Sequence, residues 1–228
     1  MAELIVAFDL DSGREALALA DRLTGLRWAK IGPVLYVREG PALVRELSRR
    51  GVRVFLDLKW HDIPSTVAGA VTAARDLGVA MATVHTLGGP AMLTAAAAAA
   101  RDLPLVGVTV LTSHASADFE QVMGRGVPDL GAEAERLARL AIGAGLRGVV
   151  ASGHELSLLR EALGPEPLIV VPGIRFPEAA RPAADDQARS MAPAEAVRLG
   201  ATHLVVGRPI TQAGDPAAAY RRLLEVLG

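Results

Sequence analysis

Eight short runs rich in β-branched residues recur along the chain, and the segments between them have the composition of helices. Apolar runs of roughly four to eight residues are typical of strands buried on both faces, as in parallel sheets covered by helices. Eight such units in 228 residues predict a closed α/β barrel of the (β/α)8 type, folded as a single domain over residues 1–228. The expected strands are residues 4–10, 27–32, 52–59, 81–87, 105–112, 148–152, 168–174 and 203–210.

The segments between the strands carry helix signals. Glycine follows several of them directly before the next strand, as at Gly51, Gly78 and Gly200, and is expected to end each helix in the left-handed conformation. An open doubly wound sheet is the other architecture that this alternation allows, but no GxGxxG motif follows the first strand. Examples of the expected helices are Arg14–Leu23, Pro41–Arg50, Thr66–Leu77 and Ala132–Ala144.

The composition excludes several classes of protein. The 24 basic and 25 acidic residues balance, which gives no support to a nucleic-acid-binding surface. The absence of cysteine excludes disulfides and thiolate metal sites. The longest weakly apolar run, residues 91–100, is too short to span a membrane, and the acidic first residues do not resemble a signal peptide. We therefore expect a cytoplasmic protein that binds neither membrane nor nucleic acid.

Ionisable residues gather where the predicted strands end, most densely in FLDLKWHDIPST at residues 55–66. Asp57 and Lys59 are two residues apart, so both side chains are expected on one face of the strand, at the barrel mouth where such barrels perform chemistry. Lys30 and Asp9 end the second and first strands on the same rim, and Lys30, Asp57, Lys59 and Asp62 are expected to form an array of alternating charge. Asp62 lies beyond the strand and can face either this cavity or another subunit.

The last two strand ends carry the signature of a phosphate site. The seventh strand runs into VPGIR and the eighth into VVGRPIT, in the region where barrels of this type often bind phosphate. Gly207 allows close backbone approach, and Arg208 offers a fork of donors to phosphate oxygens. The loop at about residues 174–191, which contains Arg175, is long for a compact barrel; it is either a lid over the ligand or a disordered surface loop.

These residues, taken together, resemble the orotidine 5′-phosphate decarboxylase family of the bacterial type, from end to end of the chain. The combination of DxKxxDIP with PGIR, DDQ and VGRPIT is the specific part of the match. Trp60 and Ser65 depart from the family, which more often carries an aliphatic residue and asparagine there. The matching motifs are AFDL (7–10), KIG (30–32), DLKWHDIPST (57–66), TVHTLGG (83–89), VTVLTS (108–113), VVASGHE (149–155), VPGIR (171–175), DDQ (185–187) and VVGRPIT (205–211).

The resemblance implies decarboxylation of orotidine 5′-phosphate to uridine 5′-phosphate and carbon dioxide, the last step of UMP synthesis, with no cofactor and no metal. It implies that Lys59 protonates C6 of the pyrimidine, that Asp57 lies beside the departing carboxylate, and that Lys30 completes the charge array. It also implies a homodimer in which Asp62, with Ile63 and Thr66, reaches the neighbouring subunit's site.

The remaining substrate contacts are also implied by the resemblance alone. Asp9 contacts the ribose hydroxyls, and Thr112, with Ser113 beside it, lies along the pyrimidine edge. Gln187 bridges base and phosphate from the closing loop. The phosphate contacts fall to Gly207 and Arg208 with Arg175 nearby, and Pro172 of the PGIR motif lines the same part of the site.

Two other functions fit parts of the sequence. The metal-dependent sugar-phosphate decarboxylases and lyases of the same superfamily share DxKxxD, but their second strand usually ends in an acidic metal ligand, where this chain has the cation Lys30. A barrel that binds nucleotide without converting it would be expected to have lost Lys59 or Asp57, and both are present.

Overall fold

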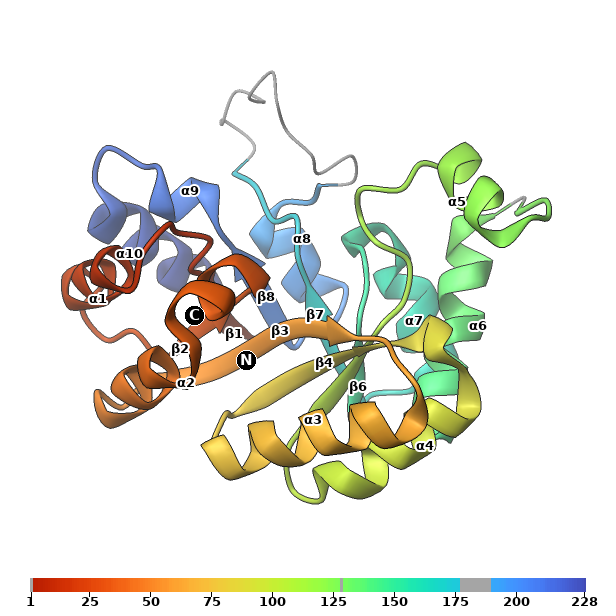
Figure 1. The fold of residues 1–228 in the computed structure, drawn as a ribbon. Helices are drawn as coiled ribbons and strands as arrows, with labels where there is room; N and C mark the ends of the chain where they lie inside the picture. Colours follow the sequence, from red (N-terminus) through yellow and green to blue (C-terminus); the bar gives the residue numbers. More distant parts are fainter. Residues whose placement is uncertain (1, 128, 177–189) are drawn as a thin grey trace.

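Eight parallel strands close into a barrel in the computed structural model, which describes residues 2–127, 129–176 and 190–228 (Figure 1). Each strand pairs with its neighbour in sequence, and β1 pairs with β8, from Glu3 opposite His203 to Val6 opposite Val206, to complete the ring. The prediction of a (β/α)8 barrel is thereby confirmed. The strands are β1 Glu3–Ala7, β2 Trp28–Ile31, β3 Arg53–Trp60, β4 Met81–His85, β5 Leu105–Val108, β6 Gly148–Val150, β7 Leu168–Val171 and β8 His203–Val206.

Helices surround the barrel and lie between successive strands (Figure 1). The predicted glycine stops are confirmed, since Gly51, Gly78 and Gly200 have φ of 80°, 82° and 96°. The helices are α1 Gly13–Arg22, α2 Pro33–Arg49, α3 Pro64–Leu77, α4 Gly89–Ala100, α5 Ser116–Met123, α6 Leu130–Gly143, α7 Leu156–Leu163, α8 Pro193–Arg198, α9 Arg208–Thr211 and α10 Pro216–Leu227, with 3-10 turns η1 Thr86–Gly88 and η2 Gly153–Glu155.

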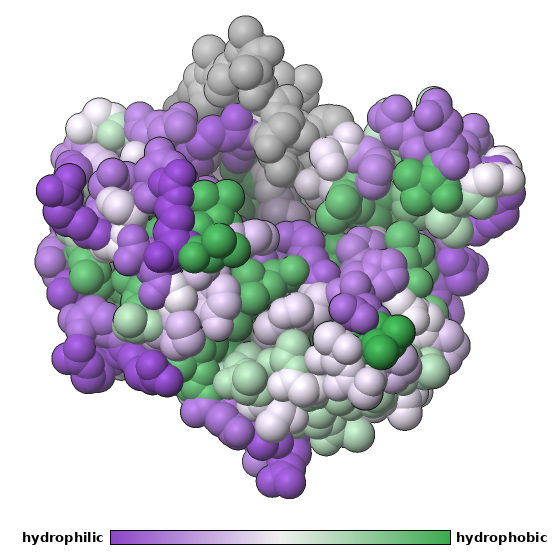
Figure 2. Space-filling model, viewed as in Figure 1, coloured by the Kyte–Doolittle hydropathy of each residue, from purple (hydrophilic) through white to green (hydrophobic). Residues whose placement is uncertain are grey.

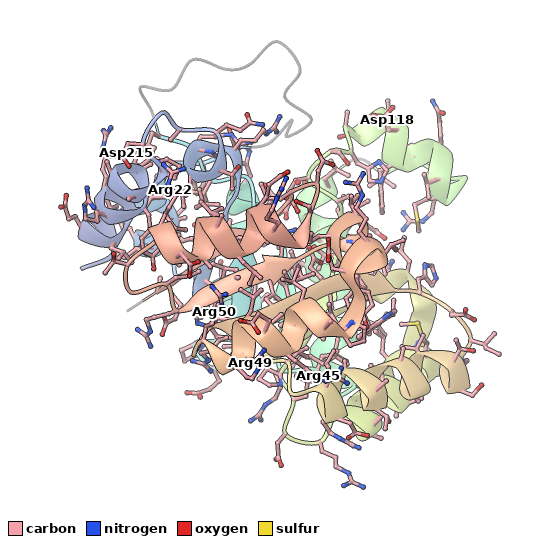
Figure 3. All side chains as sticks on the ribbon, turned by 60° about the vertical axis from the view of Figure 1, so that its left-hand side comes forward. Arg22, Arg45, Arg49, Arg50, Asp118 and Asp215 are labelled. Atoms are coloured by element: carbon pink, nitrogen blue, oxygen red, sulfur yellow. The ribbon has the colours of Figure 1, made fainter. Side chains whose placement is uncertain are left out.

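Helix α2 begins earlier than the sequence predicts. The expected start at Pro41 is in fact a bend within the helix, where Gly40 has φ 58° and ψ −154°. A Gly-Pro pair reads as a helix boundary, which is why residues 33–39 were missed. The arginines of the second half extend outward from the helix (Figure 3), and Arg50 bridges to Glu46 and Asp21 at 2.8 and 2.6 Å.

Apolar side chains fill two layers. One lies between the strands and the helices, and the other fills the barrel interior. Trp28 is almost fully buried in the interior layer, where Arg53 lies 4.3 Å above its ring and His203 meets it edge-on at 5.4 Å. The rim at the carboxyl ends of the strands is polar. The charged residues predicted there therefore lie above the apolar layer that fills the barrel interior.

Within the described residues, no helix is both long and apolar enough to cross a membrane.

The predicted strands at 105–112 and 168–174 end earlier than expected, at Val108 and Val171. Their last predicted residues leave the sheet and line the barrel rim instead. The carboxyl ends of the strands thus place loop residues around one opening.

Candidate active site

A cavity of about 660 Å³ opens at the carboxyl ends of the strands. Residues of β1, β2, β3, β5, β6 and β8 and of the loops after β5 and β7 line it, so one opening collects groups far apart in the sequence. Most residues predicted for the site lie here: Asp9, Lys30, Asp57, Lys59, Thr112, Ser113, Pro172, Arg175, Gly207 and Arg208.

Four charged side chains alternate in sign across one side of this cavity. The Lys59 Nζ lies 2.9 Å from both carboxylate oxygens of Asp57. The Lys30 Nζ lies 3.6 Å from Asp57 Oδ2 and donates to Asp9 Oδ1 at 2.9 Å. The array is therefore continuous in the order Asp9, Lys30, Asp57, Lys59, and its second carboxylate is that of Asp9 instead of the expected Asp62.

Asp57 is the buried centre of this array, with 7% of its surface exposed. Burial acts to raise the pKa of Asp57, but the charges of Lys30 and Lys59 and hydrogen bonds from Lys59 and Thr83 hold that pKa below its ordinary value. The carboxylate is therefore ionised at neutral pH. Two ammonium groups flank it on adjacent strands, so its charge has a fixed position.

Lys59 lies in a distortion of β3 that the sequence pattern did not predict. Leu56 pairs with Ala82 and Trp60 with Val84, so three residues of β3 face the single residue Thr83 of β4. Lys59 has a φ of 50°, a left-handed conformation that costs about 1–3 kcal/mol for a non-glycine residue. The simple alternation expected for Asp57 and Lys59 is thus replaced by a bulge, yet both side chains still reach the cavity.

Thr83 was not singled out from the sequence and is in direct contact with the array. Its hydroxyl donates to Asp57 Oδ1 at 3.1 Å and accepts the Lys59 backbone N–H at 2.8 Å. It is fully buried. A signal existed: Thr83 lies two residues after Met81, which faces the barrel interior, so the polar Thr83 is expected on the same inward face of β4.

The other side of the cavity combines cationic and apolar groups. Arg208 begins α9 directly after Gly207, and Arg175 follows β7. Val108, Val110 and Ala151 supply apolar wall, and Thr112 lies beside them with 8% of its surface exposed. The opening therefore has an anion-binding end and a flat apolar wall with a hydroxyl, which suits a phosphorylated ring compound.

The segment at residues 174–191 is closed at its base. Ile174 pairs with Met191 in a short parallel bridge, and Arg175 N donates to Met191 O at 3.0 Å. The two ends of this segment thus meet at the rim. Gln187, with Asp185 and Asp186, lies outside the described residues, so its predicted contacts have no structural test here.

Asp62, Ile63 and Thr66 do not line this cavity. All three are exposed, and Asp62 Oδ1 accepts the Ile63 N–H at 2.6 Å. The structure therefore separates them from the array of their own chain. Of the two placements left open by the sequence, the cavity of the same chain is not occupied by Asp62.

Two histidine rings stack beside Lys59. The ring centroids of His61 and His85 lie 5.8 Å apart with 24° between the ring planes. Burial, and then the nearby His61, Lys59 and His114, lower the pKa of His85 to about 4. In the described parts of the chain, no three His, Asp or Glu residues are grouped as metal ligands.

Comparison with known proteins identifies relatives of this arrangement. Residues 2–223 match the family described as orotidine 5′-phosphate decarboxylase / HUMPS. The chain is 53% identical to an orotidine 5′-phosphate decarboxylase of Alkalilimnicola ehrlichii over 97% of this chain and 94% of the relative, and 50% identical to one of Opitutus terrae over 99% and 98%. The crystal structure of the Lactobacillus acidophilus orotidine 5′-phosphate decarboxylase superposes with a TM-score of 0.87 at 33% identity, covering all of both chains.

Proposed function

The chain belongs to the orotidine 5′-phosphate decarboxylase / HUMPS family, and from that premise we propose that it converts orotidine 5′-phosphate to uridine 5′-phosphate and carbon dioxide. The observation that carries the mechanism is the buried carboxylate of Asp57 held between Lys30 and Lys59.

Lys59 supplies both charge and proton. When the bond between C6 and the carboxylate breaks, carbon dioxide leaves and the electron pair stays on C6, in an orbital that the ring carbonyls cannot delocalise. A fixed ammonium group near C6 stabilises that charge in a site shielded from water. Lys59 then donates a proton from Nζ to C6, which completes uridine 5′-phosphate.

Asp57 and Lys30 prepare this step. Asp57 lies beside the substrate carboxylate, and its ionised state makes the loss of that carboxylate as neutral carbon dioxide more favourable. Lys30 contacts both Asp57 and Asp9 and so keeps the array in place before substrate enters. Such preorganisation avoids rearrangement of charges during the reaction.

The rest of the cavity binds the nucleotide. Gly207 and Arg208, with Arg175 and Pro172 at the neighbouring strand end, take the phosphate, because this is the end of the cavity that carries guanidinium groups. Asp9 binds the ribose hydroxyls, and Thr112 and Ser113 lie along the base. Gln187 is assigned to bridge base and phosphate on the strength of the sequence motif alone.

We propose a homodimer in which Asp62, Ile63 and Thr66 complete the partner's site. Figure 2 shows one group of apolar side chains over the first turns of α2 and a separate, smaller one where β3 leads into α3. The exposed apolar residues there are Val34, Val37 and Ile63, which are 59%, 84% and 64% exposed. A shared apolar face next to Asp62 is what a subunit interface at this position requires.

The metal-dependent sugar-phosphate alternative is not supported. The curated relatives above are named orotidine 5′-phosphate decarboxylases, and the ammonium group of Lys30 lies where those enzymes usually carry an acidic ligand. The cytoplasmic location expected from the sequence stays a prediction.

The test is an absorbance assay of the purified protein with orotidine 5′-phosphate in excess chelator. We expect rapid loss of orotate absorbance and formation of uridine 5′-phosphate. An unchanged spectrum with folded protein, followed by activity on a sugar phosphate once magnesium is added, would overturn the proposal.

A further inference from the structure

We propose that Thr83 is a positioning residue for the reaction, which holds the Lys59 main chain and the Asp57 carboxylate in register with each other. The inference rests on the proposed function, because it assigns a role within the same site. It goes beyond the charged residues by assigning the geometry of the array to a neutral side chain on the neighbouring strand.

The bulge in β3 leaves Lys59 without a regular partner residue on β4. Between two ordinary pairs, Leu56 with Ala82 and Trp60 with Val84, the only residue of β4 is Thr83, while β3 has three. The regular ladder cannot serve three residues with one partner. Instead, the Lys59 backbone N–H donates to the Thr83 hydroxyl at 2.8 Å. A side chain thus anchors the point at which Lys59 adopts its positive φ.

The direction of the hydrogen bonds assigns the hydroxyl proton of Thr83 to Asp57. A backbone N–H can only donate, so the Thr83 oxygen must accept from Lys59, and its single proton is free for Asp57 Oδ1 at 3.1 Å. Asp57 Oδ2 faces Lys30 at 3.6 Å. The Thr83 proton therefore fixes the rotation of the carboxylate, which presents Oδ2 to Lys30 and both oxygens to Lys59.

Two other buried threonines make hydrogen bonds of a different kind. Thr86 and Thr109 are also fully buried, but their hydroxyls donate to the backbone carbonyls of Val108 and Val150. These bonds join neighbouring strands and involve no charged group. Thr83 alone of the three is bonded to both members of the Asp57–Lys59 pair, so its removal should affect chemistry as well as stability.

The experiment compares Thr83→Val, Thr83→Ser and the control Thr86→Val. Valine keeps the shape and removes the hydroxyl, whereas serine restores it. For Thr83→Val we expect kcat to fall about 10- to 100-fold, the scale of a displaced catalytic group, while affinity for uridine 5′-phosphate changes less than about twofold. Thr83→Ser should regain most of the rate. Thr86→Val should lose stability but keep kcat.

A pH profile distinguishes positioning from a merely structural role. Without the Thr83 proton, ionised Asp57 loses a donor, so the acidic limb of kcat in Thr83→Val should move to higher pH, and in Thr86→Val it should not. If Thr83→Val does not fold, Thr83→Ala is compared with Thr86→Ala in the same way. A kcat within about twofold of the unsubstituted chain, or equal losses at both positions, would overturn the inference. The unsubstituted chain measured in parallel tests the proposed function separately.

Discussion

Asp57 shows how a single residue keeps its charge in a buried place. Burial alone would favour the neutral acid, but Lys59 on the same strand and Lys30 and Thr83 on the two neighbouring strands stabilise the anion more than burial destabilises it. The folded pKa lies below the ordinary one, so its contribution to stability is present above the unfolded pKa and is lost as pH falls through the folded value. At neutral pH the site is therefore charged before substrate arrives.

Arg208 gives a prediction at the same scale. Arg208→Ala should weaken binding of uridine 5′-phosphate about 10- to 150-fold, because one charge-assisted hydrogen-bonding group is lost, and should leave binding of uridine nearly unchanged. Titration calorimetry with both ligands measures this. Arg198→Ala, on the exposed end of α8, is the matched control. Equal losses for nucleotide and nucleoside would show that Arg208 is structural.

At the scale of elements, the sequence predicted regular features and missed local exceptions. Strand order and helix stops follow from apolar runs and from Gly51, Gly78 and Gly200, because these depend on local backbone preferences. The charged rim followed from the topology. The sequence did not predict the bulge at Lys59 or the role of Thr83, because both arise from pairing between two strands. The bend of α2 at Gly40 was missed for the opposite reason, since local signals suggested a helix boundary.

The buried His203 at the start of β8 makes the stability of the fold sensitive to acid. Burial, with a smaller effect of Arg53, lowers the pKa of His203 from 6.5 to about 4. Between these values the unfolded chain binds a proton that the folded chain does not, so the free energy of unfolding falls as pH falls. One such histidine contributes a slope of up to about 1.4 kcal/mol per pH unit, and His85 acts in the same direction.

Denaturant unfolding between pH 4 and 6.5 tests this expectation. His203→Gln should reduce the slope of the unfolding free energy against pH by an amount that corresponds to about one bound proton. His154→Gln, at an exposed position, is the control and should leave the slope unchanged. An unchanged slope in His203→Gln would contradict the assignment of a neutral, buried His203.

For the whole molecule, the proposed dimer makes each site a product of two chains. Asp62 is exposed and outside the cavity of its own chain, next to the exposed apolar residue Ile63. Asp62→Ala and Lys59→Ala should each be inactive alone. When the two variants are mixed in equal amounts and exchange subunits at random, half the dimers are hybrids with one complete site, so about one quarter of all sites should recover.

The mixing experiment needs one control and has one contradicting result. Lys59→Ala mixed with the double variant Lys59→Ala/Asp62→Ala should stay inactive, because no pairing restores Lys59. Hybrid dimers that form, as shown by mass, and yet stay inactive would place Asp62 in the site of its own chain.

The most direct test of the central claim is the rate of Lys59→Ala at saturating orotidine 5′-phosphate, with Lys59→Arg beside it. The account predicts that kcat falls by about 10³-fold or more in both, because alanine removes the charge and arginine cannot release a proton at neutral pH. Affinity for uridine 5′-phosphate should persist, since the phosphate and ribose contacts lie elsewhere in the cavity. A folded Lys59→Ala protein that turns over substrate at close to the unsubstituted rate would show that this lysine neither stabilises nor protonates C6.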